Sequence, residues 1–544
     1  MNMLSRASLV LTILAFVSPG IVLTDSPRST HHPSDSSYPI TTAFLDAGRI
    51  WISFNNRGSM NYDSLGEGAF WSKVPGSYTE SLVFDEGLWV IGKVNGQIRA
   101  GIVQWGSSYS PGPIPGNPQD SLRYRCYKIT RGDTTSQDYM QWPADLGAPV
   151  DASGKPKISG DQMIWEVYNS ADSSVSHLGF RGAPLGLLPV EVRQSAFTRA
   201  ATGCDSVPLL ANVIFQEWVI INKGNAPIES AYVSLWSDID FGDIESDVPA
   251  VDTVDQVGYC WQDHFAQSIP PPRPPAVGYV LLYGPIVPSP GDMGMFMGKP
   301  RSGVRNLGMS SFWGILDDST PDTSFIGPAY SLTSVWNIAH ALDKLGDPII
   351  DPTGHVTRFP YSGDPVTGTG WVYSGTFRGG GSGFNLFSGP FTMAPGDTQW
   401  VMAALVPGLG RDRFESIEAM RRNAAALRSM SYDSLLQGAF PHTVCEQEIL
   451  PPTPTLLQNY PDPFNNGATI EYTVPAPSHA VLEIFNVLGQ KVATLLNQDK
   501  AADHYWVPFR LTNIASGVYY YRLMTTPVSG GGSSLQTKKM VLLR

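Results

Sequence analysis

Seven carboxylates and no lysine or arginine lie in residues 236–255, WSDIDFGDIESDVPAVDTVD. If AYVSLWSDIDF is a strand, its side chains alternate between two faces, so its last two aspartates point the same way and the next acids follow in a loop. Calcium takes about six to eight oxygen ligands, which clustered carboxylates and loop carbonyls supply. The alternative is a solvated acidic loop. The predicted structural Ca²⁺ ligands are Asp238, Asp240, Asp243, Glu245 and Asp247.

Other acids could perform acid–base chemistry on a glycan, because a glycosidase uses two carboxylates about 5–10 Å apart. The candidates are Asp85 with Glu86, Asp161 with Glu166, and the acids of residues 236–255. Ordinary surface and turn acids are the preferred interpretation, since acids are abundant in this chain. Neither a Gly-x-Ser-x-Gly motif nor a His-Glu-x-x-His motif occurs. The sequence leaves enzymatic activity open and favours a protein without it.

The elements that must position these residues are strands. With 544 residues the chain exceeds the roughly 250–300 residues at which a single core stops growing. Its 54 glycines and 45 prolines place a turn signal every few residues, which favours short strands over long helices. Val94-Asn95-Gly96-Gln97 predicts a hairpin, and a second hairpin turn is expected around Gly224-Asn225.

Two segments predict helices that pack on this β-rich region. Residues 334–346 have helical periodicity up to Gly346, and residues 411–430 begin with Asp412 and Glu415 in a capping-box arrangement. The predicted apolar faces are Val335, Ile338, Leu342 and Leu345 in the first helix, and Phe414, Ile417, Ala424 and Leu427 in the second.

The N-terminus predicts export. Arg6 precedes the apolar run ASLVLTILAF, which is too short for a membrane span, so residues 1–24 are expected to be a signal peptide and residues 25–39 a disordered leader. The net charge of −12 argues against nucleic acid as a partner. Cys126, Cys204, Cys260 and Cys445 contain no C-x-x-C pair. Cys204 and Cys260 flank the acidic segment and could form a disulfide, with buried free thiols as the alternative.

The C-terminal residues have a signature of their own. After a Pro-rich linker at 446–455, short alternating strands with glycines at the turns predict a small β-sandwich at 456–544. The motifs QNYP and PFN (458–465), IFN (484–486), GQ (489–490), SGVY (516–519) and KMVL (539–542) follow in order. This segment resembles the type A C-terminal sorting domain of type IX secretion cargo in the Bacteroidota and their relatives.

The resemblance implies export across the inner membrane, passage across the outer membrane directed by this domain through contact with the type IX machinery, and release or attachment at the cell surface. The sorting-signal residues it points to are Tyr460, Pro461, Pro463, Phe464, Gly489, Gly517, Lys538 and Lys539. Asp462 stands where the family usually has Asn, Asn466 where Pro is common, and AADHYW lacks the usual glycine. These departures concern turns and leave the lysine-containing last strand intact.

The sequence therefore predicts a mostly β fold. A large β-rich cargo at 40–445, of one or two subdomains with two packing helices, is followed by the immunoglobulin-like β-sandwich at 456–544. The cargo segments GLWVIGKVNGQIRAGI and SLWSDIDFGD resemble a group of secreted proteins with the same tail, which implies the same compartment and no particular substrate. A non-enzymatic module that binds a glycan or surface polymer, or builds an extracellular layer, is the expected function. A carbohydrate-active hydrolase is the alternative.

Overall fold

The computed structural model describes residues 39–60, 68–70, 81–171, 185–200, 208–241, 246–263, 274–316, 331–373, 382–437, 453–459, 462–464, 467–500, 503–510 and 514–543. The predicted signal peptide, and all of the predicted leader except its last residue, lie outside these ranges. The described chain is mostly β, as the turn signals predict.

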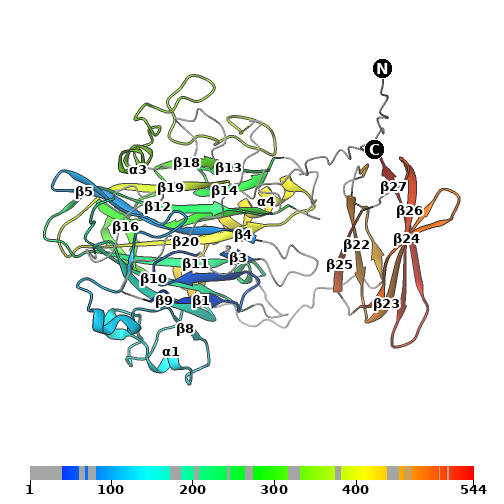
Figure 1. The fold of residues 1–544 in the computed structure, drawn as a ribbon, viewed down its shortest axis with the longest axis horizontal. Coiled ribbons are helices and arrows are strands. Elements are labelled where there is room, and N and C mark those ends of the chain that lie inside the picture. The colour runs from blue at the N-terminus through cyan, green and yellow to red at the C-terminus, as the bar shows by residue number, and fades with distance from the viewer. Residues whose placement is uncertain are drawn as a thin grey trace, which may run out of the picture. The chain divides into compact units, whose positions relative to one another are not determined.

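The largest sheet of the cargo has nine antiparallel strands in the order β13-β14-β15-β20-β11-β10-β9-β7, and β8 pairs with β9 beside β7. The strands run across the cargo in Figure 1. Their bounds are β7 Ser110–Pro111, β8 Tyr127–Thr130, β9 Gln162–Asn169, β10 Val190–Thr198, β11 Ile214–Asn222, β13 Asp247–Asp252, β14 Val257–Gln262, β15 Ala276–Tyr283 and β20 Thr398–Gly408.

A second sheet has five strands in the order β18-β19-β12-β5-β6. Its strands β18 and β19 contact β13 and β14 of the large sheet, so the two sheets pack face to face. Strand β5 is buried along most of its length, as expected for a strand covered on both faces. The bounds are β5 Asp85–Val94, β6 Gln97–Gly101, β12 Ile228–Ile239, β18 Ser311–Leu316 and β19 Ser382–Met393.

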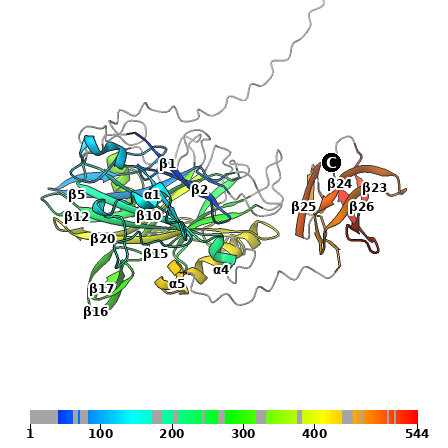
Figure 2. The ribbon, with the colours of Figure 1, turned by 90° about the horizontal axis from the view of Figure 1, so that it is seen from below.

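Two smaller sheets complete the cargo. Strands β1 Thr42–Leu45, β2 Trp51–Asn55, β3 Ala69–Phe70 and β4 Ser81–Val83 form one, and the hairpin of β16 Ile286–Phe296 and β17 Lys299–Asn306 forms the other. Figure 2 shows this hairpin standing out beside β20 and β15. Nearly all of the buried apolar residues from Leu45 to Leu436 belong to one cluster, so the described cargo has one hydrophobic core.

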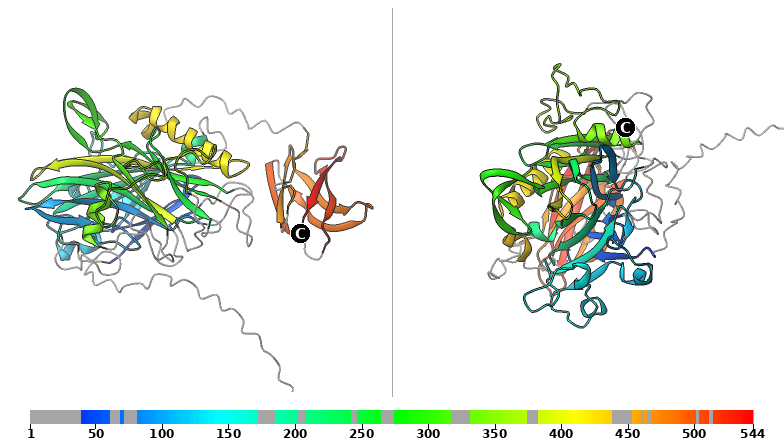
Figure 3. Two further views of the ribbon diagram at one scale, coloured as in Figure 1. Left: turned by 90° about the horizontal axis from the view of Figure 1, so that it is seen from above. Right: turned by 90° about the vertical axis from the view of Figure 1, so that its left-hand side faces the viewer.

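Five α-helices are present in the described residues: α1 Gln137–Met140, α2 Pro208–Ala211, α3 Leu332–Ala339, α4 Arg413–Ser429 and α5 Tyr432–Gln437, with 3₁₀ turns at Pro118–Arg123 and Ala144–Leu146. Helix α4 confirms the second predicted helix. The Asp412 side chain accepts hydrogen bonds from the backbone N–H groups of Phe414 and Glu415, and Ile417, Ala424 and Leu427 are buried. Helix α4 contacts β20, β15 and β14, and Figure 3 shows it lying over the strands.

Helix α3 is shorter than predicted, because it ends at Ala339 instead of Gly346. The Asp343 carboxylate accepts the backbone N–H groups of Leu345, Gly346 and Asp347 at 2.8–2.9 Å, which closes a separate turn. Leu345 is 77% exposed, so its assignment to the packed face was wrong. A side chain that hydrogen-bonds nearby backbone competes with the helix for the same donors.

One predicted hairpin is confirmed and the other is wrong. Strands β5 and β6 are joined at Asn95 and Gly96, which both have positive φ angles of 51° and 75°. The turn at Gly224-Asn225 instead connects β11 of the large sheet to β12 of the second sheet. The reason is long-range, because β12 pairs with β5 on one side and β19 on the other.

The C-terminal domain consists of two antiparallel sheets, β21-β22-β25 and β24-β23-β26-β27. Buried residues from both sheets, including Tyr472, Leu482 and Tyr521, form one cluster, which confirms the predicted small β-sandwich. The bounds are β21 Thr455–Leu456, β22 Gly467–Val474, β23 Ser478–Asn486, β24 Lys491–Lys500, β25 Asp503–Arg510, β26 Gly517–Pro527 and β27 Ser534–Leu542.

The cysteines and the helices bear on two further predictions. Cys126 and Cys260 are buried free thiols, which was the alternative interpretation. The predicted disulfide between Cys204 and Cys260 was therefore wrong. Cys204 and Cys445 lie outside the described residues. No helix within the described ranges has the length and apolar character needed to cross a membrane.

Candidate functional site

Phe464 of the predicted sorting signal is a structural anchor of the C-terminal domain. Its side chain is 1% exposed and its ring lies 5.5 Å from that of Phe509. Its backbone N–H donates to the carbonyl of Val541 at 2.9 Å, and the N–H of Leu543 donates to its carbonyl at 2.8 Å. The segment around Pro463 thus lies along the edge of β27, where a proline costs no ladder hydrogen bond.

Asp462, a departure from the family pattern, uses both carboxylate oxygens. One accepts the backbone N–H of Val541 at 2.7 Å, and the other accepts the side-chain amide of Gln458 at 2.9 Å. The Gln458 amide also donates to the carbonyl of Lys539 at 2.7 Å. An asparagine would offer one carbonyl oxygen in place of two carboxylate oxygens. The aspartate therefore fits its position in this chain.

The remaining sorting-signal residues separate into turn and surface positions. Gly489, with φ of 75°, lies in the turn between β23 and β24, and Gly517 begins β26 opposite Leu542. Lys538 is half-buried and Lys539 is exposed on β27. Tyr460 and Pro461 lie outside the described residues. Among the described residues of the predicted signal, the two lysines have polar side-chain groups that are open to a partner.

Asp238 lies at the end of β12, as the alternation predicts, but it is buried. It is 7% exposed and its cross-strand neighbour on β5 is Asp85. Its carboxylate accepts the indole N–H of Trp105, and Asp85 accepts the hydroxyl of Ser59 at 2.8 Å. The end of this strand therefore carries carboxylates inside the protein instead of on a solvated loop.

Asp240 and Asp247 lie near Asp238, around the thiol of Cys260. The Asp247 carboxylate, 1% exposed, accepts the backbone N–H of Phe241 at 3.0 Å, and Gln262 donates to the Phe241 carbonyl at 3.0 Å. Burial raises the pKa of the Cys260 thiol, and the charges of Asp247, Asp238 and Asp240 raise it further. Three of the five predicted calcium ligands thus lie around one buried thiol.

Asp243 and Glu245, the other two predicted ligands, lie outside the described residues. Within the part of the chain that the structure describes, no group of three or more His, Cys, Asp or Glu side chains has the arrangement of a metal site. Asp252 forms an ion pair with Arg421 at 3.3 Å instead of joining the cluster. Calcium binding by this loop stays a prediction.

The acids considered for glycan hydrolysis are either buried or held in ion pairs. Asp85, Glu86 and Glu166 are at most 4% exposed. Asp161 forms ion pairs with Arg131 at 3.2 Å and with Arg199 at 2.9 Å. Glu166 accepts the Cys126 thiol at 3.1 Å, and burial raises its pKa to about 8.

A buried polar chain crosses the interior between the two large sheets, and the sequence analysis did not identify it. Glu86 of β5 accepts the side-chain amide of Gln216 on β11, and burial raises the pKa of Glu86 well above its usual value. The Gln216 carbonyl accepts the amide of Gln194 on β10 at 3.2 Å. Gln194 accepts the hydroxyl of Tyr168 at 2.8 Å and the indole N–H of Trp218 at 3.0 Å.

These polar residues point into the core from strands whose inward neighbours are apolar. A glutamine at an inward position of an alternating strand, as in FQEWV at 215–219, is the signal that could have revealed the chain. Because every residue of this buried polar chain is buried, its hydrogen bonds hold the two sheets together, and it offers no surface to a ligand.

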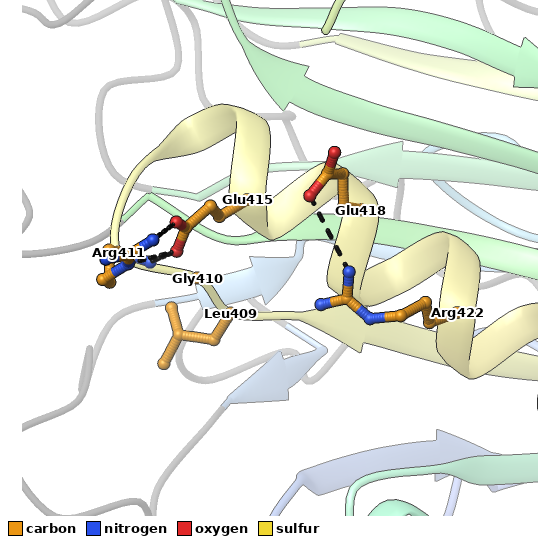
Figure 4. Close-up of a pocket in the computed structure, with 6 residues that line it drawn as sticks. All are labelled: Leu409, Gly410, Arg411, Glu415, Glu418 and Arg422. Carbon is orange, nitrogen blue, oxygen red and sulfur yellow. Dashed lines mark hydrogen bonds and ion pairs between the residues drawn. The ribbon is translucent and has the colours of Figure 1, made fainter.

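A pocket on the cargo surface lies at the start of α4 (Figure 4). It is lined by Leu409, Gly410, Arg411, Glu415, Glu418 and Arg422. Its charges pair internally, Arg411 with Glu415 and Arg422 with Glu418 at 3.7 Å. Arg411 lowers the pKa of Glu415 to about 2. None of the predicted site residues lines this pocket.

The comparison with known protein families concerns the C-terminal domain. The family described as the secretion system C-terminal sorting domain matches residues 458–541. A search of curated proteins gave no match to the chain. The matched range covers nearly all of the sandwich that the sequence and the fold delimit.

Similar solved structures include a polysaccharide lyase, with 8% identity, a TM-score of 0.20 and coverage of 65% of this chain and 34% of that chain. Dimeric latent PorU from Porphyromonas gingivalis has 13% identity, a TM-score of 0.15 and coverage of 70% and 31%. The chain therefore spans about a third of the length of either protein. At such TM-scores neither similarity indicates a shared fold.

Proposed function

We propose that this protein, a cargo of the type IX secretion system, acts at the cell surface or outside the cell as a binding or structural module and not as an enzyme. Export would begin with the signal peptide at 1–24 and be directed across the outer membrane by the domain at 456–544. The mature cargo would then be attached to the outer-membrane surface or released.

The burial of the candidate acids is the observation that carries this proposal. A glycosidase needs two carboxylates that flank a sugar in a cleft. Asp85, Glu86 and Glu166 instead lie inside the cargo, and Asp161 forms ion pairs with two arginines. Their contacts support a role in holding the sheets together.

The test is to incubate the purified full-length protein with a set of soluble and insoluble polysaccharides. Retention on at least one polymer, without release of new reducing ends, is the expected result. Release of sugars that a heat-denatured sample does not produce would overturn the proposal and favour the carbohydrate-active hydrolase.

A structural calcium ion in the acidic loop is a further part of the proposal. The charges of Asp238, Asp240 and Asp247 all raise the pKa of the Cys260 thiol, so the three carboxylates lie near one another. Clustered carboxylates repel one another unless a cation or a proton offsets their charge. A weak extracellular site with Kd of about 10⁻⁴–10⁻³ M, in about 5 mM Ca²⁺, would stabilise the cargo by about 1–2 kcal/mol.

Unfolding in calcium and in chelator tests this ion. Stabilisation by Ca²⁺ that disappears in the variant Asp238→Asn/Asp240→Asn is expected. Asp397→Asn, which changes an aspartate far along the chain in the turn before β20, is the matched control and should keep the response. Equal stability of the unmodified protein in calcium and chelator would rule the site out.

A further inference from the structure

The β16–β17 hairpin is a positively charged surface on an acidic protein. Residues 286–306 contain Lys299, Arg301 and Arg305 but one acid, Asp292, which gives a local charge of +2 (three cations minus one carboxylate), whereas the whole chain has a net charge of −12. All three cations are exposed on β17. The hairpin stands out beside the large sheet in Figure 2.

These cations differ from the arginines in the rest of the cargo. Many of those pair with carboxylates: Arg123 with Asp145, Arg125 with Asp138, Arg193 with Glu191, and Arg421 with Asp252 and Asp364. In the described ranges, neither Lys299, Arg301 nor Arg305 forms an ion pair. The Arg301 guanidinium lies 5.5 Å from the ring centre of Phe296, and this contact leaves its hydrogen-bond donors available.

The hairpin is held firmly in place. The Asn306 side chain donates to the carbonyls of Gly284 and Met295 at 2.8 and 2.9 Å and accepts the N–H of Met295 at 2.7 Å. Gln399 of β20 bonds both the N–H and the carbonyl of Ile286 at its base. Gly298, at its turn, packs against the ring of Tyr432. Cations on a fixed scaffold lose less entropy when they bind a ligand.

The spacing of the cations suits a chain of anionic groups. Lys299 and Arg301 are two residues apart on one strand and so project from the same face about 7 Å apart. The planar guanidinium matches carboxylate and sulfate groups with two hydrogen bonds. Arg305 extends the positive surface towards the base of the hairpin. Such a row of charges favours a repeating anion over a single small one.

We propose that Lys299, Arg301 and Arg305 of this hairpin bind an acidic polysaccharide. The inference rests on the proposed binding function and names its site and ligand class. A second copy of the chain is less suitable, because acids such as Asp145, Asp138 and Asp364 are already paired with its own arginines. Nucleic acid is less suitable because the hairpin offers three cations, fewer than the about 6–10 phosphate contacts through which proteins neutralise a nucleic-acid backbone.

The experiment measures binding of the full-length protein to polygalacturonate, which bears carboxylates, to heparin, which bears sulfates, and to uncharged dextran. The variant Lys299→Gln/Arg301→Gln/Arg305→Gln should weaken binding to at least one acidic polymer by about tenfold or more. The control Lys155→Gln/Lys157→Gln/Arg422→Gln also removes three exposed positive charges and should bind as the unmodified protein does. All three proteins should unfold at the same temperature.

Several results would overturn the inference. Acidic polymer bound equally by the hairpin variant, or dextran bound as tightly as the acidic polymers, would show that these cations do not provide the affinity. If the unmodified protein self-associates and binds no acidic polymer, and the hairpin variant does not self-associate, the partner of the hairpin is a second copy of the chain. Binding of dextran alone would contradict the hairpin site but would still support the proposed binding function. Binding to none of the polymers would contradict both the hairpin site and the proposed binding of a polymer.

Discussion

The buried carboxyl group of Glu166 makes the stability of the cargo depend on pH. Glu166 is 1% exposed on β9, it accepts the Cys126 thiol, and burial raises its pKa from 4.5 to about 8. Between these values the folded protein keeps a proton that the unfolded chain releases. Its contribution to stability is therefore complete below pH 4.5 and is lost as the pH rises towards 8.

The size of the effect follows from this pKa difference. One retained proton changes the free energy of unfolding by about 1.4 kcal/mol per pH unit, so the full interval corresponds to about 5 kcal/mol. Glu166→Gln is neutral at every pH and removes this dependence. Its amide adds buried N–H donors at a cost of about 1–3 kcal/mol. We expect the variant to be less stable than the unmodified protein at pH 5 and more stable by about 2–4 kcal/mol at pH 8.

Urea unfolding followed by tryptophan fluorescence at pH 5, 6.5 and 8 measures this difference, because 13 of the 14 tryptophans precede residue 446 and report on the cargo. Burial also raises the pKa of Glu86, and the resulting pH dependence of stability is the same in both proteins, so it cancels in the comparison. Asp145→Asn, at a surface carboxylate whose pKa Arg123 lowers, should shift stability equally at all three pH values. A loss of stability in Glu166→Gln that is the same at pH 5 and pH 8 would refute the reasoning.

Two further predictions concern the buried polar chain and the sorting domain. Gln194→Leu leaves the Tyr168 hydroxyl and the Trp218 indole without their acceptor, so the cargo should lose about 2–5 kcal/mol in urea unfolding, and an unchanged midpoint would contradict this. Phe464→Ala removes a buried anchor and should destabilise the sorting domain by about 3–5 kcal/mol and reduce export, measured by immunoblotting of cell and medium fractions, whereas Val487→Ala, at a 65% exposed position, should be exported normally.

Local signals predicted some elements correctly, because the cause of those elements lies within a few residues. Asn95 and Gly96 adopt the positive φ angles that a two-residue hairpin requires, and Asp412 caps α4. The end of α3 was missed because the carboxylate of Asp343 captures backbone donors that a longer helix would have used. The turn at Gly224 was misassigned because strand pairing is decided by distant residues.

The candidate site shows the same limit. The clustering of Asp238 and Asp240 followed from strand alternation, but their burial and their proximity to Cys260 depend on strands elsewhere in the chain. Glu86 and Gln216, which meet across the two sheets, are 130 residues apart in sequence. No periodicity within one segment could have paired them.

The sorting domain and the cargo differ in how they use their polar residues. In the sorting domain, Asp462 and Phe464 lie in a recognisable motif and also build the fold, so the motif and the structure identify the same segment. In the cargo, most of the acids that invited a chemical interpretation serve the fold from inside. Lys299, Arg301 and Arg305 form no ion pair within the described residues, so their replacement should change binding and leave stability almost unaltered. A surface residue that the fold does not need is the more direct indication of a partner, and in this cargo the hairpin supplies it.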